Sequence, residues 1–326
     1  MRRTLVAAAA AAATALVLSG CGTSEPAETS SDKKSEPITL TDANGAQVKL
    51  DGPAKKVVGT EWNVVESLVT LGVDPVGVAD VKGYKAWDSA VPLKNDPKDI
   101  GTRGEPSMDT LAGLTPDLIV TTTDMSASAV KQMKKVGPVL QVKAADGADQ
   151  IGQMFDTLDV IAKATGTTDE AKKAKESYEA KVAEGKKALK EAELDGSKIA
   201  FADGYAASNQ VSVRGYTSNS LLGAVNEDLG LKNDWKIKGD KDYGLATTDV
   251  EGLTKLGDDV KFVYIGNKDD GSSDVFTDEL ADNAVWKSLP FVKDDEVHRL
   301  PDGIWMFGGP EAMEAYIDAL VDTLKK

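Results

Sequence analysis

A continuous run of good helix formers, from about Thr167 to Ala192, is the feature that most constrains what this chain can fold into. No proline interrupts the run, and at about 1.5 Å per residue it predicts a helix roughly 35–40 Å long, several turns longer than an average globular helix. Thr167 and Glu170 have the spacing of a capping box, which places the helix start at this point.

One narrow face of this predicted helix is apolar. Its small and apolar residues recur at three- and four-residue steps: Ala171, Ala174, Tyr178, Val182, Gly185, Leu189 and Ala192. The other faces are charged, and oppositely charged residues stand four positions apart, as in Lys172 and Glu176. An ordinary surface helix or a coiled-coil arm would show the same pattern. The similarity of the sequences on its two sides favours a helix that connects two alike halves.

The length, charge and residue counts exclude several classes of protein. The 326 residues are long for one core and sufficient for two domains. The formal net charge of −15 opposes binding to nucleic acid. With a single cysteine, Cys21, and a single histidine, His298, an intrachain disulfide, a cysteine-rich zinc site and a Cys/His nucleophilic pair are excluded. His298 lies in an alternating, strand-like segment, so we expect it to have a structural or surface role. No motif supports catalysis, and we expect the protein not to be an enzyme.

The N-terminus has the features of an export signal. In residues 1–21, two arginines precede a short Ala/Val/Leu run and the sequence Leu18-Ser19-Gly20-Cys21. The run is too short and too rich in alanine for a stable membrane span. The last four residues resemble the bacterial lipobox, which predicts a diacylglyceryl group on Cys21 and anchoring to the outer face of the cytoplasmic membrane. A plain secreted protein is the alternative. Residues 22–37 are small and polar and predict a flexible tether.

The remaining chain alternates predicted strands with predicted helices. Asn44-Gly45, between two alternating runs, predicts a β-hairpin over residues 38–50. The α/β alternation fills residues 38–148 and resumes in residues 194–326, with a helix pair at 149–193. Such alternation predicts mostly parallel sheets covered on both faces. We therefore predict an α/β fold of two Rossmann-like lobes, joined by the single long rigid helix, with a ligand cleft between them.

A weak internal repeat supports two similar lobes. Residues 107–120 correspond to residues 249–263 with one insertion. In both copies, a capped helix opens with an acidic residue in its first turn, Asp109 or Glu251, and leads into a strand. Taken alone, such charges are ordinary surface charges that stabilise a helix end.

Motifs in both halves resemble the iron(III)-hydroxamate siderophore-binding lipoproteins of ABC importers. The matching segments are Thr60-Glu61-Trp62, Glu66-Ser67-Leu68, Gly77-Val78-Ala79-Asp80, Arg103-Gly104-Glu105-Pro106, residues 286–292 and residues 304–308. The resemblance extends from about Val57 to the C-terminus. It implies a solute-binding protein that captures a ferric siderophore and delivers it to a membrane permease, and we expect it to act as a monomer.

The resemblance also implies the binding residues. Arg103 matches the arginine that hydrogen-bonds the hydroxamate oxygens around iron, and Arg214 is a second ligand contact in a less clearly aligned loop. The positions matched to the aromatic lining are Trp62, Tyr84, Trp87, Tyr243, Trp305 and Phe307. Thr121 and Met125 stand where the family has a pocket tryptophan and tyrosine, which leaves the particular hydroxamate open. Asp109 and Glu251 match the acidic residues that dock onto permease arginines, and Glu105, four residues upstream, is a near alternative to Asp109.

The chemistry of the ligand agrees with these residue types. Ferric iron is a hard cation, and because a siderophore supplies its six oxygens, the protein needs neither a metal ligand nor a cofactor. A nearly neutral tris-hydroxamate complex suits guanidinium groups and aromatic faces. The alternatives are another iron chelate, of citrate or catecholate type, and cobalamin. An enzyme using carboxylates, or a metal or haem chaperone, is less compatible with these residues. A rigid connecting helix predicts only a small closure on binding.

Overall fold

The computed structural model describes residues 36–207, 210–268 and 274–326. The predicted signal segment, Cys21 and most of the predicted tether lie outside these residues. Within the described ranges, no helix combines the length and the apolar character needed to cross a membrane.

The chain begins with the predicted hairpin. Strands β1 (Ile38–Thr41) and β2 (Gln47–Leu50) pair antiparallel. Gly45 in the turn has a φ of +80°, which glycine adopts without a steric penalty. The Asn-Gly signal therefore predicted both the hairpin and its turn correctly.

The first half of the chain forms a five-stranded parallel sheet with the order β5-β4-β3-β6-β7. Its strands are β3 (Val57–Gly59), β4 (Gly77–Val78), β5 (Lys98–Asp99), β6 (Leu118–Thr122) and β7 (Val139–Val142). The helices of this half are α1 (Trp62–Thr70), α2 (Val81–Trp87), α3 (Met108–Leu114) and α4 (Ala127–Met133). Leu118 and Val120 enter one apolar cluster and Ile119 another, so both faces of the sheet are buried. The prediction for this half is confirmed.

The second half forms a six-stranded mixed sheet. Its path is β11-β9-β8-β12-β13, and β10 also pairs with β8. The strands are β8 (Lys198–Ala207), β9 (Gln210–Tyr216), β10 (Lys232–Asn233), β11 (Leu245–Thr248), β12 (Val260–Tyr264) and β13 (Val297–Arg299). The pairs β8/β9 and β9/β11 are antiparallel. The prediction of a mostly parallel sheet is therefore wrong for this edge, because β9 and β11 are strands that the helix-strand alternation did not reveal.

Short helical segments connect these strands. They are α7 (Leu221–Asp228), the 3-10 turn η1 (Glu251–Lys255), the π turn η2 (Val275–Glu279), α8 (Ala284–Ser288), α9 (Pro290–Lys293) and the closing helix α10 (Pro310–Leu324). Both copies of the internal repeat form a capped helical turn that leads into a strand. Ser107 caps α3 before β6, and Asp249 accepts a hydrogen bond from Gly252 N in η1 before β12.

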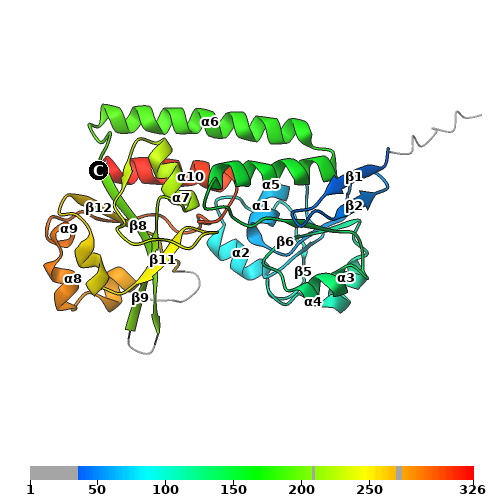
Figure 1. Ribbon diagram of the computed structural model, residues 1–326, viewed down its shortest axis with the longest axis horizontal. Helices are drawn as coiled ribbons and strands as arrows, with labels where there is room; N and C mark the ends of the chain where they lie inside the picture. The colour runs from blue at the N-terminus through cyan, green and yellow to red at the C-terminus, as the bar shows by residue number, and fades with distance from the viewer. Residues whose placement is uncertain (1–35, 208–209, 269–273) are drawn as a thin grey trace, which may run out of the picture. The chain divides into compact units, whose positions relative to one another are not determined.

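Two consecutive helices, α5 (Gln150–Thr165) and α6 (Thr168–Glu191), connect the sheets. Figure 1 shows α6 running beside α5 and α10, with which it packs. Four residues of the predicted stripe are buried: Ala171, Tyr178, Gly185 and Leu189. A Cβ at Gly185 would lie 2.7 Å from Ile317 Cγ2 and 2.9 Å from Leu229 Cδ2, so this glycine permits the close approach of α6 to α10 and α7.

The predicted capping box is wrong in its details. Thr167 precedes the helix, but its side chain makes no capping hydrogen bond. Its hydroxyl instead shares a hydrogen bond of 2.8 Å with the hydroxyl of Thr165. Gly166, with a φ of +74°, ends α5 and brings the two threonines together in a tight turn.

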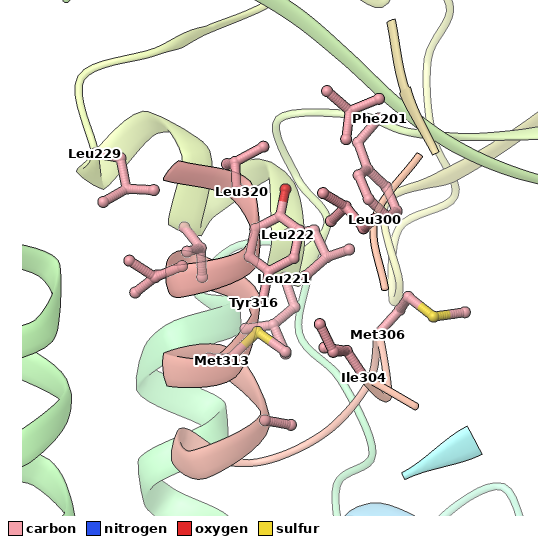
Figure 2. Close-up of a cluster of buried hydrophobic side chains, with 14 of the residues drawn as sticks. Phe201, Leu221, Leu222, Leu229, Leu300, Ile304, Met306, Met313, Tyr316 and Leu320 are labelled. Atoms are coloured by element: carbon pink, nitrogen blue, oxygen red, sulfur yellow. The ribbon is translucent and has the colours of Figure 1, made fainter. Parts of the chain in front are cut away.

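Helix α10 buries its apolar face in the second half. Figure 2 shows Met313, Tyr316 and Leu320 of α10 among side chains from β8, α7 and the segment that precedes α10. The same cluster includes Val69 and Met154 from the first half and from α5. Residues 35–326 form one compact unit, so the lobe boundaries at 148 and 194 remain a prediction.

Candidate functional site

A cavity of about 460 Å³ lies where segments of both halves meet. The residues that line it are Glu61, Trp62, Asn63, Trp87, Arg103, Ala144, Arg214, Tyr243, Leu245, Trp305, Met306 and Phe307. In the first half, residues 60–63, 103 and 144 follow the carboxyl ends of β3, β5 and β7. This edge of a parallel sheet is where α/β proteins ordinarily bind ligands. All the predicted ligand residues except Tyr84 line the cavity.

Arg103 lies against two indole rings that also contact each other. Its Cζ atom is 4.1 Å from the ring centroid of Trp62 and 5.3 Å from that of Trp305. The two rings meet edge to face, with centroids 4.7 Å apart, and Trp62 Nε1 donates to Ala79 O at 3.2 Å. The guanidinium is thus held in place by cation–π contacts, while its side chain remains 36% exposed. Its free N–H groups can donate to a ligand.

Aromatic rings from both halves form a continuous wall. The ring centroid of Trp305 lies 6.4 Å from that of Trp87 and 5.2 Å from that of Phe307. The ring of Phe307 in turn meets that of Tyr243 at 5.7 Å. Except for the buried Trp62, these rings are half-buried, so they keep apolar surface for a ligand.

Each arginine of the cavity has a carboxylate partner. Arg103 Nη1 donates to Glu61 Oε2 at 3.2 Å. Burial raises the pKa of Glu61, and the positive charge of Arg103 opposes that shift. Arg214 on β9 donates from Nε to Asp203 Oδ1 at 2.8 Å and also contacts Asp203 through Nη2. The hydroxyl of Tyr216 donates to the same carboxylate at 3.1 Å.

A further hydrogen bond joins the two halves beside the cavity. The hydroxyl of Tyr243, which precedes β11, donates to Asp124, which follows β6. Tyr243 is therefore both an aromatic wall residue and a link between the halves.

Tyr84 does not reach the cavity, so its predicted role is wrong. It is fully buried, and its hydroxyl donates to Val91 O at 2.7 Å. It packs beneath Trp62 with Val65 and Val78. Helix α2 is short, and it turns Tyr84 toward the sheet while Trp87, three residues later, lines the cavity.

Thr121 and Met125, which were matched to aromatic pocket residues, do not lie at the cavity in this structure. Thr121 is buried and accepts a hydrogen bond of 2.7 Å from the hydroxyl of Thr60. Met125 is buried in an apolar cluster of the first half. Neither is among the described residues that line the cavity.

Sequence reasoning missed several residues of the site. Glu61 was part of a matched motif, and its place directly before Trp62 was the available signal. Met306 lay in the matched segment 304–308, although no role was assigned to it, and it lines the cavity. Asp203 and Asp124 do not line the cavity themselves and had no local signal, because only the pairing of β8 with β9 and the packing of the halves bring them to Arg214 and Tyr243.

The two predicted docking residues lie outside the cavity lining. Asp109 is exposed in the first turn of α3, and Glu251 is exposed at the start of η1. Their role in permease docking stays a prediction.

No group of three or more His, Cys, Asp and Glu side chains is arranged to hold a metal ion within the described part of the chain. His298 lies in β13, where its Nε2 pairs with Glu296 at 2.8 Å.

A buried carboxylate connects α1 with the segment that carries Trp305 and Phe307. Glu66 accepts a hydrogen bond of 2.9 Å from Ala312 N in the first turn of α10. Burial raises the pKa of Glu66 to about 7, and backbone hydrogen bonds from Ala312 and Gly309 oppose the shift. Burial and the neighbouring Glu66 also raise the pKa of Asp88 well above its usual range.

The raised pKa predicts a pH-dependent stability. Because the pKa of Glu66 rises from 4.5 to about 7 on folding, the folded state binds more protons between these values, and this group's stabilisation is lost as the pH rises through 7. Glu66→Gln should therefore gain roughly 1–3 kcal/mol relative to the wild type between pH 5 and pH 8. Urea unfolding at several pH values measures the difference. Glu176→Gln, on an exposed position of α6, should show no such trend. A pH-independent difference for Glu66→Gln would contradict this assignment.

Comparison with known protein families adds independent information. Residues 57–303 match the model of a family described as periplasmic binding protein. The chain is 28% identical over 317 residues to the Fe(3+)-citrate-binding protein YfmC of Bacillus subtilis (strain 168), covering 95% of this chain and 93% of that protein. It is 27% identical over 318 residues to the iron(3+)-hydroxamate-binding protein FhuD of the same organism, covering 95% and 94%.

A solved structure has the same fold. The crystal structure of the Fe3+-Desferal-bound siderophore-binding protein FhuD from Vibrio cholerae matches with a TM-score of 0.73 and 22% identity, over 83% of this chain and 98% of that chain. The predicted fold class is confirmed. The relatives also confirm the resemblance that the motifs predicted, and their names include both hydroxamate and citrate binders.

Proposed function

Because the chain belongs to the periplasmic binding protein family, we propose that it captures a ferric hydroxamate siderophore outside the cytoplasm and delivers it to an ABC permease. The observation that carries this proposal is the position of Arg103 against both Trp62 and Trp305 at the wall of the cavity. The family is one of solute-binding proteins, and we propose that this chain catalyses no reaction.

The cavity suits a nearly neutral iron chelate. Its volume of about 460 Å³ is within the range of ordinary small-molecule sites. The guanidinium of Arg103 can donate to the polarised oxygens that surround the iron. The half-buried rings of Trp87, Tyr243, Trp305 and Phe307 can cover the apolar linkers between the hydroxamates. In this role the ligand brings its own iron, which is cargo of the protein and not a cofactor.

Two observations help to choose between ferric hydroxamates and other iron chelates as the ligand. YfmC is named as a citrate-binding protein, which keeps ferric citrate as the second candidate. A ferric citrate or catecholate complex carries negative charge, whereas both cavity arginines already have carboxylate partners. Hydroxamates therefore fit the cavity better than anionic chelates.

Replacing Arg103 should remove most of the binding. Loss of a charged hydrogen-bond donor costs about 1.5–3 kcal/mol, which is about tenfold to a hundredfold in affinity. Titration of purified Arg103→Ala with ferrichrome and ferrioxamine, followed by tryptophan fluorescence quenching, measures the loss. Lys82→Ala removes an exposed cation of α2 and serves as the matched control. Wild-type affinity in Arg103→Ala would remove this residue from the site.

We propose that Asp109 and Glu251, one in each half, dock the protein onto permease arginines. The double variant Asp109→Lys/Glu251→Lys should keep its affinity for the siderophore but lower uptake of radioactive iron from ferrichrome by about tenfold or more, because like charges would then face each other. Asp169→Lys/Asp258→Lys carries the same charge change at other exposed positions. Unchanged uptake in the first variant, or an equal loss in the control, would disprove the docking role.

We also propose that lipid on Cys21 anchors the protein, as a monomer, to the outer face of the cytoplasmic membrane. Without acyl chains, the residues that follow Cys21 offer little apolar surface to hold the protein at a membrane. In Cys21→Ser, the protein should either appear in the medium instead of the membrane fraction or accumulate as the uncleaved precursor. Immunoblots of the cell fractions distinguish both forms from the mature wild type. A mature wild-type N-terminal peptide whose mass lacks acyl groups would contradict the proposal.

A further inference from the structure

We propose that Glu61 and Asp203 set the charge preference of the cavity by neutralising its two arginines, so that neutral or cationic ferric chelates are accepted and anionic chelates are rejected. The inference rests on the proposed function of the cavity as a site for ferric chelates. It assigns a specificity role to two carboxylates that do not themselves need to touch iron.

The pairing in the first half is direct. Glu61 lines the cavity next to Arg103, and the 3.2 Å ion pair between them leaves the glutamate side chain 24% exposed. Glu61 directly precedes α1 and Trp62, so its position is set by the same turn that places the indole under Arg103. A ligand that approaches Arg103 therefore also meets the Glu61 carboxylate.

The pairing in the second half is built into the sheet. Asp203 of β8 and Arg214 of β9 are directly opposite each other in the antiparallel register. Both carboxylate oxygens contact the guanidinium, and Tyr216 donates to one of them. The side chain of Asp203 is only 11% exposed. Because a cross-strand pair of this kind is fixed by backbone hydrogen bonds, Arg214 cannot turn toward a ligand without leaving the buried carboxylate with only its hydrogen bond from Tyr216.

The two carboxylates therefore balance the charges of the two cavity arginines. Among the described residues that line it, the cations are Arg103 and Arg214. Glu61 and Asp203 cancel them, and Asp124, bonded to Tyr243, adds a negative charge beside the wall. The net charge of −15 on the whole chain acts in the same direction.

This balance discriminates between classes of chelate. Three hydroxamates and Fe³⁺ sum to zero charge, whereas a tricatecholate complex and ferric citrate are anionic. Next to aromatic walls, where the local dielectric is low, an anion would need uncompensated cations. Here the positive charges of both arginines are already compensated by Glu61 and Asp203. Rejection of the wrong ligand by repulsion is a common source of specificity in binding sites.

The test uses the variants Glu61→Gln and Asp203→Asn, singly and combined. Each amide removes the negative charge and keeps one oxygen that can accept from its arginine. Asp203→Asn also removes one acceptor, because both oxygens of Asp203 accept hydrogen bonds in the wild type. Affinities for ferrichrome, ferric citrate and a ferric tricatecholate are measured by fluorescence quenching. We expect the ratio of ferric citrate to ferrichrome affinity to rise about tenfold or more in the double variant. Glu105→Gln, an exposed carboxylate two residues from Arg103, should leave the ratio unchanged.

The outcomes separate this inference from the proposed function. An unchanged ratio in the double variant, or an equal rise in Glu105→Gln, would overturn the inference even if the wild type binds ferrichrome tightly. Failure of the wild type to bind any ferric hydroxamate would instead overturn the proposed function, and the gain for ferric citrate would still test the charge effect. If Asp203→Asn does not fold, judged by its circular dichroism, Glu61→Gln alone decides. A ratio unchanged in that single variant overturns the inference.

Discussion

The hydrogen bond from Ala312 N to the buried carboxylate of Glu66 ties the end of the chain to its first half. It holds the start of α10, and the segment just before α10 carries Trp305 and Phe307. These two rings meet Trp62 and Tyr243 and complete the wall of the cavity. The geometry of the site therefore depends on a contact outside it, between helices that are far apart in the sequence.

Burying a carboxylate is costly, and the backbone N–H groups at the start of α10 offset only part of that cost. The high pKa of Glu66 reflects this imbalance. Burial of apolar side chains offsets this cost, because Met306, Met313 and Tyr316 all lie in the apolar cluster next to α10 (Figure 2). The hydrogen bond at the start of α10 and the burial of its apolar face together hold the segment of Trp305 and Phe307 in one position.

The elements with a strong local pattern were predictable. The hairpin turn, the parallel strands of the first sheet and α6 all follow from turn residues, short apolar runs and helical periodicity. The antiparallel strands β9 and β11 were not. β9 pairs with the neighbouring β8, but the helix-strand alternation did not reveal it, and the pairing of β11 with β9 joins segments on either side of α7. Tyr84 and Trp87 show the same limit at the site: both are aromatic residues of one short helix, and only packing decides that one is core and the other is wall.

By itself the sequence determined the class of fold, the long helix between two α/β halves and the residue types of the site, because periodicity and composition are local properties. It also excluded a metal site built mainly from cysteine or histidine, since the chain has one residue of each type. Which side chains meet was set by the three-dimensional packing of the chain. The pairing of Arg103 with Glu61 and of Arg214 with Asp203 depends on strand register and on the contact between the halves. Those are relations between distant residues, which no local pattern records.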